Sequence, residues 1–163
     1  PWNQLVEREN IVLHKMVNEA PVRLSESIEV TPTLVPHRDE FSETVGYHIE
    51  GPNKSALFIP DIDKWDKWEK DIVAEIKKVD YAFIDATFYS GKEINNRDIS
   101  EIPHPFVIES IKMFEGLSEK DKSKVVFIHF NHTNPLLDPN SQESLLVLQK
   151  GFKIGRINDV FEL

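Results

Sequence analysis

The sequence predicts an α/β domain in which helices cover one face of a mixed β-sheet. After residue 55, short apolar runs alternate with stretches that have helical spacing. Before residue 55, the β-prone segments are short and are joined by polar turns. Strands that alternate with helices usually form one sheet with the helices packed on it, so the two observations together predict this fold class.

The first third of the chain predicts an antiparallel meander. A short helix is expected at residues 1–6, because proline is tolerated in a first helical turn. β-Prone pieces follow at 11–14 and 22–24, a half-buried alternating strand at 28–35, its partner at 44–49, and a further strand at 56–59 beyond the turn at 51–53.

The remaining segments alternate between helix and strand. A helix is expected to begin after Asp63 as its N-cap and to reach about residue 78, with Trp65 and Trp68 on its core face. The other expected elements are a buried strand at 81–84, a loop at 89–103 that contains Asn95 and Asn96, a helix at 106–114, a helical turn at 118–123, a strand at 125–130, a helix from Asn140 or Ser141 to 151, and two short strands within 152–163.

Composition excludes several classes of protein. The chain has 163 residues, enough for one domain with a real core, and no apolar run approaches the roughly 20 residues that span a bilayer. A net charge of −9 repels a nucleic-acid backbone unless a metal site reverses the local sign. The chain has no cysteine, so any metal must be held by histidine and carboxylate, and a cytoplasmic location is consistent with this composition.

Three predicted strands are each followed by side chains that bind metals or protons. These are Asp61 and Asp63 after 56–59, Asp85 after 81–84, and His129 and His132 after 125–128. Groups at strand ends on one rim converge on a ligand. Two of them also have purely structural interpretations, because Asp63 can cap a helix and Asp85 can anchor the turn that contains Thr87.

His37 lies in a polar loop between two predicted strands, where a histidine more often has no function. Asp61 and His129, considered together with His37, strengthen the hypothesis that His37 has a functional role. Imidazole and carboxylate suit zinc, manganese or iron, and an open position on such an ion lowers the pKa of bound water toward neutrality. His37, Asp61 and His129 could therefore supply part of a hydrolytic centre with one or two metal ions.

The order of these motifs resembles the second half of a metallo-β-lactamase-fold hydrolase. The quinone-biosynthesis (PqqB-like) branch is most similar, and the transfer-RNA 3′-processing endonucleases and phosphonate-pathway phosphodiesterases share a sparser pattern. The segments that carry the resemblance are Pro-His-Arg-Asp-Glu-Phe-Ser-Glu-Thr-Val-Gly-Tyr at 36–47, Pro-Asp-Ile-Asp-Lys-Trp at 60–65, Ile-Asp-Ala-Thr-Phe at 84–88, His104, and His-Phe-Asn-His-Thr-Asn-Pro at 129–135.

The resemblance implies particular roles for the site residues. His37, Asp61 and His129 stand where the family has metal ligands, Asp61 being the bridging aspartate. His104 stands where the endonuclease branch has a catalytic histidine near the leaving group, although Pro105 and the residue after it depart from that branch. His132 either orients the His129 ring, the role we prefer, or competes with it as a ligand. Asp63 and Asp85 are expected to support the ligands from behind.

The family signature His-x-His-x-Asp-His is absent from these 163 residues. By the resemblance it belongs before residue 1. The chain is therefore expected to be the C-terminal half of one metallo-β-lactamase-type αββα sandwich domain, and to need the N-terminal half or another protomer to complete it.

Three functions remain open at this point. The leading one is a hydrolase for a small ester or phosphodiester that uses hydroxide bound to one or two zinc ions, and is active only with the N-terminal half. The second is an oxidative enzyme of quinone-cofactor biosynthesis on the same ligands, because these can also hold iron, with manganese a further alternative. The third is a non-enzymatic half-domain that assembles with a partner through its uncovered apolar strands.

Overall fold

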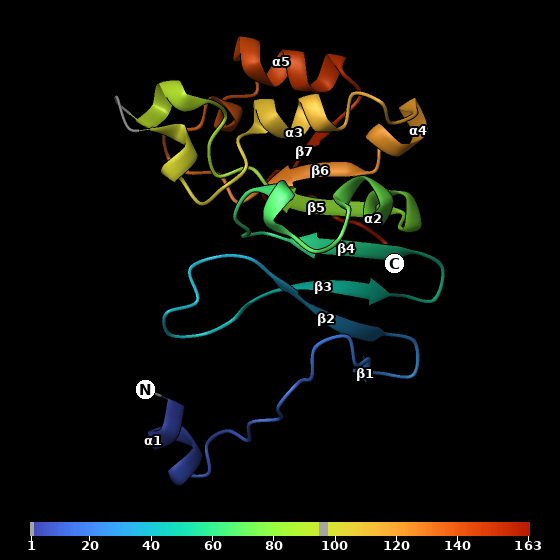
Figure 1. Cartoon of the computed structure of the whole chain (residues 1–163). Helices are drawn as coiled ribbons and strands as arrows, with labels where there is room; N and C mark the ends of the chain where they lie inside the picture. Colours follow the sequence, from blue (N-terminus) through green and yellow to red (C-terminus); the bar gives the residue numbers. More distant parts are fainter. Residues whose placement is uncertain (1, 95–97) are drawn as a thin grey trace.

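The computed structural model describes residues 2–94 and 98–163, within which seven strands form one sheet in the order β1-β2-β3-β4-β5-β6-β7 (Figure 1). The strands are β1 (Val22–Arg23), β2 (Glu29–Val35), β3 (Thr44–Glu50), β4 (Ser55–Ile59), β5 (Tyr81–Asp85), β6 (Val125–Ile128) and β7 (Lys153–Ile154). The α-helices are α1 (Trp2–Glu7), α2 (Ile72–Lys78), α3 (Val107–Met113), α4 (Glu119–Lys122) and α5 (Gln142–Gln149). The 3₁₀ helices are η1 (Trp65–Lys67), η2 (Gly91–Ile94), η3 (Ile99–Glu101) and η4 (Pro135–Leu137).

The sheet has an antiparallel and a parallel part that meet at β4. β1 to β4 pair antiparallel, so the predicted meander is confirmed. β4, β5, β6 and β7 pair parallel, which requires a crossover between each strand and the next. The helices that follow β4, β5 and β6 lie in these crossovers. The predicted class, a mixed sheet with helices packed on it, is thus confirmed.

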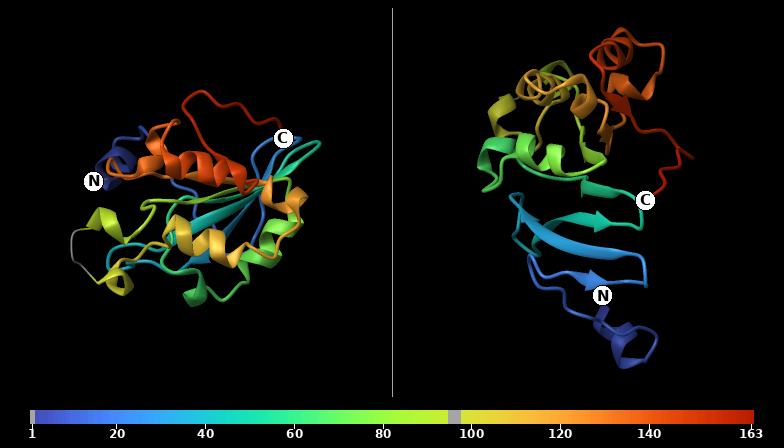
Figure 2. Two further views of the ribbon diagram at one scale, coloured as in Figure 1. Left: turned by 90° about the horizontal axis from the view of Figure 1, so that it is seen from above. Right: turned by 90° about the vertical axis from the view of Figure 1, so that its right-hand side faces the viewer.

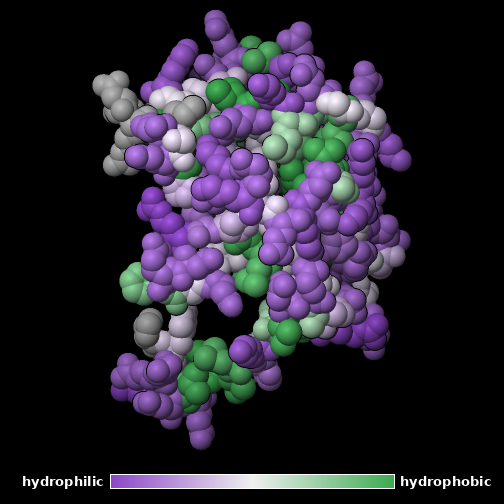
Figure 3. Space-filling view, in the orientation of Figure 1, coloured by the Kyte–Doolittle hydropathy of each residue, from purple (hydrophilic) through white to green (hydrophobic). Residues whose placement is uncertain are grey.

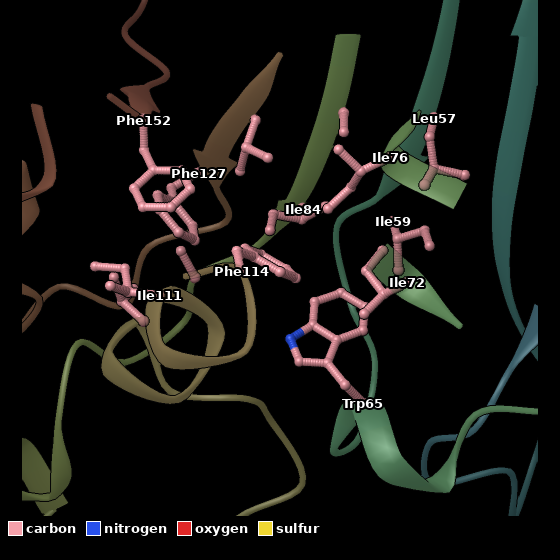
Figure 4. Close-up of a cluster of buried hydrophobic side chains, with 14 of the residues drawn as sticks. Leu57, Ile59, Trp65, Ile72, Ile76, Ile84, Ile111, Phe114, Phe127 and Phe152 are labelled. Carbon is pink, nitrogen blue, oxygen red and sulfur yellow. The ribbon is translucent and has the colours of Figure 1, made fainter. Parts of the chain in front are cut away.

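The core lies between the parallel strands and the helices. Alternation along β4 and β5 directs Leu57, Ile59 and Ile84 toward the helices, where they are at most 2% exposed. Figure 4 shows these side chains packed against residues of α2 and α3 and against Trp65. Further members of the cluster are Ile72, Ile76, Ile111, Phe114, Phe127 and Phe152.

Helices α2 and α3 do not pack on the opposite face of the sheet, which is partly covered by the C-terminal segment (Figure 2). Phe161 packs edge-on against Phe83 and Tyr81, with ring centroids 4.8 and 5.3 Å apart. The predicted pair of strands at 152–163 is wrong in its second member. After β7 the segment packs through aromatic contacts instead of a strand ladder.

The prediction of one helix from Asp63 to about residue 78 is also wrong. The chain forms η1 and then the separate helix α2, whose N-cap is Asp71, with its side chain accepting a hydrogen bond from the Val73 amide. Trp65 and Trp68 are buried as expected, but each is fixed by a tertiary hydrogen bond from its indole nitrogen, to Ser110 Oγ and to the Leu34 carbonyl oxygen. Because these two hydrogen bonds fix the tryptophan side chains, they favour two short helices over one continuous helix.

Smaller differences lie at the two remaining irregular regions. The 11–14 piece forms no strand and belongs to an extended N-terminal arm, in which Val12 and Leu13 are exposed. Figure 3 shows hydrophobic side chains at the surface of the lower part of the molecule, where this arm runs. The loop predicted at 89–103 contains η2 and η3, while Asn95 and Asn96 lie outside the described residues. The helix capped by Ser141 is confirmed as α5. Among the described helices, none combines the length and the apolar character needed to cross a bilayer.

Candidate metal centre

Three of the predicted site residues meet because three parallel strands lie side by side. Asp61 follows β4, Asp85 ends β5 and His129 follows β6, and the carboxyl ends of adjacent parallel strands share one edge of the sheet. In Figure 1 these ends are the arrowheads of β4, β5 and β6. Ligand atoms of Asp61, Asp85, His104 and His129 all lie within 4.8 Å of one another.

Asp85 is the buried anchor of the group. Its side chain is fully buried and its two oxygens accept hydrogen bonds from the Ile62 amide, from the amide and hydroxyl of Thr87, and from His104 Nδ1, at 2.7 to 3.2 Å. Burial alone would raise the pKa of Asp85, but the imidazoles of His104 and His129 and the Thr87 hydroxyl outweigh it and lower the pKa. Asp85 is therefore an anion whose oxygens are already engaged, which suits an orienting role.

His104 comes from the loop that precedes α3 and packs over the same edge. Its Nδ1 lies 2.8 Å from Asp85 Oδ2 and 3.4 Å from Asp61 Oδ1. The loop is held by Glu109 on α3, which accepts the Phe106 amide and pairs with Lys64 Nζ at 2.7 Å. Because Lys64 lies three residues after Asp61, this ion pair links the Asp61 loop to the His104 loop.

His37 and Asp61 contact each other across the boundary between the antiparallel and parallel strands. His37 Nε2 lies 3.3 Å from Asp61 Oδ1, and the His37 and His104 rings have centroids 5.3 Å apart. The Asp63 amide donates to the Pro36 carbonyl oxygen at 2.7 Å, which joins the two loops. His37 thus lies beside the group of four without being one of its members.

Two buried atoms of this pair lack hydrogen-bond partners among the described residues. They are Asp61 Oδ1 and His37 Nδ1, and the contact of Asp61 Oδ1 with His37 is at ion-pair distance without hydrogen-bond geometry. Buried polar atoms are nearly always satisfied, so an unsatisfied carboxylate oxygen facing two imidazoles calls for an explanation. A cation among nitrogen and oxygen donors provides one, and the residues fit zinc, iron or manganese by ligand type.

His129 has a backbone conformation that is unusual for a residue other than glycine. Its φ is +64°, in the left-handed region, which costs free energy and persists where the surroundings impose it. The His129 side chain is 45% exposed, and its Nδ1 lies on the side that faces the buried Asp85. Interaction with the Asp85 carboxylate raises the pKa of His129, against the opposing effect of burial.

The other two predicted support residues lie farther from these contacts. Asp63 pairs with Lys67 at 2.8 Å and accepts the Lys64 amide. Burial alone would raise its pKa, but these two hydrogen bonds lower it. His132 is exposed, and among the described residues its hydrogen-bond partner is the neighbouring Asn131. The structure does not bring its ring into hydrogen-bond contact with His129, so its orienting role stays a prediction.

Sequence reasoning did not assign a role to two residues that the structure places behind the site. Thr87 Oγ1 lies 2.7 Å from Asp85 Oδ1, 3.2 Å from His104 Nδ1 and 3.0 Å from His129 Nδ1. Asn134 is 2% exposed, and its side-chain amide donates to the carbonyl oxygens of Ala86 and Thr87. The only available signal was the position of Thr87 directly after a strand-ending aspartate.

The fold and the site define a known class of protein. The family model described as the beta-lactamase superfamily domain matches residues 2–130, and the chain belongs to this family. The resemblance to the PqqB-like branch is confirmed by curated relatives. The coenzyme PQQ synthesis protein B of Nitrosococcus oceani is 26% identical over 76% of this chain and 42% of its own length. That of Gluconobacter oxydans is 27% identical over 74% of this chain and 40% of its own length.

Solved structures show the same fold. The zinc-bound PqqB of Methylobacterium extorquens has a TM-score of 0.68 at 21% identity, covering 92% of this chain and 52% of that one. An isothiocyanate hydrolase from Delia radicum gut bacteria has a TM-score of 0.58 at 12% identity, covering 93% and 59%. The chain spans about 40% of the length of the curated relatives that it matches.

Proposed function

We propose that this chain supplies one side of a divalent-metal centre that hydrolyses a small ester or phosphodiester when the rest of the family's domain is present. The observation that carries the proposal is the buried, unsatisfied Asp61 Oδ1, which lies 3.3 Å from His37 and 3.4 Å from His104 in a set of nitrogen and oxygen donors. A carboxylate oxygen in this position suits a cation better than a structural hydrogen bond.

His37, Asp61 and His129 are the residues that would hold the metal. Zinc is the ion we favour, because imidazole and carboxylate suit it and a zinc-bound structural neighbour has this fold. Iron and manganese accept the same ligand types. When bound, the ion would act as a Lewis acid and would lower the pKa of water near neutral pH.

His104 is the proposed proton donor or acceptor. Its Nδ1 contacts the buried Asp85 carboxylate at 2.8 Å, which orients the ring and leaves Nε2 free for a substrate oxygen. The ring held in this orientation would transfer a proton between substrate and water through Nε2. This assignment makes Asp85 a positioning residue with no direct substrate contact.

A second function is favoured by the names of the relatives. The curated matches above are coenzyme PQQ synthesis proteins, so an oxidative step in quinone-cofactor biosynthesis on the same ligands is the alternative chemistry. Iron in place of zinc would distinguish it, since only the iron form would consume oxygen during turnover.

A third proposal concerns assembly. The chain covers about 40% of its relatives, and the sheet face opposite the helices carries Phe83, Ile128 and Phe161 around a groove of about 400 Å³. We propose that this face packs against the second layer of the sandwich, contributed by the rest of the domain or by another protomer. A nucleic-acid partner is disfavoured by the net charge of −9.

Metal binding tests the leading proposal. We expect Asp61→Ala in the full-length protein to abolish retention of zinc, measured by elemental analysis after gel filtration, together with hydrolysis of bis(p-nitrophenyl) phosphate and p-nitrophenyl acetate. Asp66→Ala is the matched control, because Asp66 is exposed on η1 a few residues away. An Asp61→Ala protein with wild-type zinc content would contradict the assignment.

A further inference from the structure

We propose that Thr87 is a positioning residue that fixes His129 in the tautomer with a proton on Nδ1, so that Nε2 presents its lone pair to the metal. This inference rests on the proposed metal centre for its purpose, although the tautomer itself exists without a metal. Thr87 Oγ1 is within hydrogen-bond distance of three groups of the site, namely Asp85 Oδ1, His104 Nδ1 and His129 Nδ1.

The number of protons decides how these contacts are used. A threonine hydroxyl has one proton to donate and two lone pairs to accept. Its shortest contact is with Asp85 Oδ1 at 2.7 Å, and an ionised carboxylate can only accept. The hydroxyl proton therefore goes to Asp85, and Thr87 Oγ1 must act as an acceptor toward the histidines.

An accepting oxygen requires a proton on the imidazole nitrogen that faces it. His104 Nδ1 has a nearer acceptor in Asp85 Oδ2 at 2.8 Å, compared with 3.2 Å to Thr87. His129 Nδ1 lies 3.0 Å from Thr87 but 3.7 Å from Asp85, which is beyond hydrogen-bond range. Thr87 is thus the hydrogen-bond acceptor that determines which nitrogen of His129 carries the proton.

The hydroxyl is held rigidly enough to do this. Thr87 is 9% exposed, its amide donates to Asp85 Oδ1 at 2.8 Å, and its carbonyl oxygen accepts the Asn131 amide at 2.9 Å. The Asn134 side chain binds the same turn and is itself buried. His129, by contrast, is 45% exposed, so without the Thr87 contact its ring could rotate or change tautomer.

The direct experiment is long-range ¹H–¹⁵N correlation NMR on metal-free, full-length protein with ¹⁵N-labelled histidine, at about pH 9, which is well above the ordinary pKa of a histidine side chain. The His129 signals are assigned with a His129→Gln variant. We expect wild-type His129 to have the proton on Nδ1, Thr87→Ser to keep it there, and Thr87→Val to give a mixture of tautomers. Thr33→Val is the matched control, because Thr33 is 5% exposed and lies on β2.

Zinc titration of the same proteins provides the second measurement. We expect Thr87→Val to weaken zinc binding about tenfold, in the range typical for loss of a group that orients a ligand, while Thr87→Ser and Thr33→Val stay close to wild type. If wild-type protein binds no zinc, the proposed function fails, and the NMR measurement still decides the role of Thr87.

Two results would overturn the inference. One is a wild-type His129 with its proton on Nε2, which needs no variant to observe. The other is a folded Thr87→Val protein that keeps the Nδ1 proton and the wild-type zinc affinity. If Thr87→Val does not fold, Thr87→Ala takes its place in the same comparison.

Discussion

The antiparallel and parallel parts of the sheet contribute very unequally to the candidate metal centre. In the parallel part, β4, β5 and β6 end at the same edge, and each delivers a site residue there: Asp61, Asp85 and His129. In the antiparallel part, neighbouring strands end at opposite edges, so β2 and β3 can reach the site only through the loop that connects them. That loop contributes His37.

The contrast is clearest when the carboxylate of Asp85 on β5 is compared with that of Glu50 on β3. Asp85 is fully buried beneath helices and neighbouring strands, whereas the ion pair of His48 with Glu50 on β3 lies on the surface, with Glu50 54% exposed. Asp85 therefore acts in a low-dielectric environment, where each of its hydrogen bonds contributes more and the loss of its carboxylate costs more than at a surface pair. Three predictions test this contrast and are given in order of decreasing expected effect.

Asp85→Ala should have the largest effect. It leaves the Ile62 amide, the Thr87 amide and His104 without their acceptor, and we expect the free energy of unfolding to fall by about 3 kcal/mol in urea titrations. Glu50→Ala is the control in the antiparallel part, with an expected loss below about 0.5 kcal/mol. Equal losses for the two variants would contradict the contrast.

Lys64→Met should have an intermediate effect. Lys64 is 15% exposed, pairs with Glu109 at 2.7 Å and lies 4.4 Å from the Phe106 ring centroid, so its loss should cost about 1 kcal/mol. Because the pair joins the Asp61 and His104 loops, zinc binding should also weaken. Lys78→Met, which removes the ion pair between the exposed Lys78 and Glu75 within α2, should leave zinc binding unchanged. A loss of zinc affinity in both variants would show that the link is not specific.

Glu19→Gln should have the smallest effect, and only above acidic pH. The hydrogen bond from Lys70, with a further one from Thr33, lowers the pKa of Glu19 in the folded state. A carboxylate whose pKa is lower in the folded than in the unfolded state stabilises the fold above its unfolded-state pKa, and this contribution disappears as the pH falls through the folded-state pKa.

At neutral pH the free energy of unfolding of the wild-type protein should therefore exceed that of Glu19→Gln by about 0.5 kcal/mol, and the difference should vanish as the pH falls through the folded-state pKa of Glu19. Urea unfolding at several pH values measures it. A difference that grows as the pH falls would have the wrong sign.

The parallel part of the fold was also the more predictable from the sequence. Its strands are continuous apolar runs, and the polar residues that follow them mark the shared edge, so Asp61, Asp85 and His129 could be identified before any coordinates. His37 could be named only as a loop histidine that gains support from Asp61 and His129, and His104 only from the family resemblance. Both lie in loops, and the path of a loop depends on tertiary contacts such as the hydrogen bond from the Asp63 amide to the Pro36 carbonyl oxygen.

The predictions that were wrong or missing also depended on tertiary contacts, which the sequence alone does not reveal. Asp63 precedes an apolar helical pattern, but its side chain binds the Lys64 amide and Lys67, so it does not cap a helix, and Asp71 does so instead. The last segment contains strand-forming residues, but Phe161 finds its partners on the face of β5. Thr87 went unassigned, because its importance lies in two histidines that are 17 and 42 residues away in sequence.

The most direct test of the metal centre is an anomalous-difference map collected at the zinc absorption edge from crystals of the zinc-loaded full-length protein. We expect a peak with His37, Asp61 and His129 as ligands at about 2.0 to 2.2 Å, and with Asp85 and Thr87 behind them. A zinc peak that has none of these three residues as a ligand, or no peak at this edge of the sheet, would contradict the assignment.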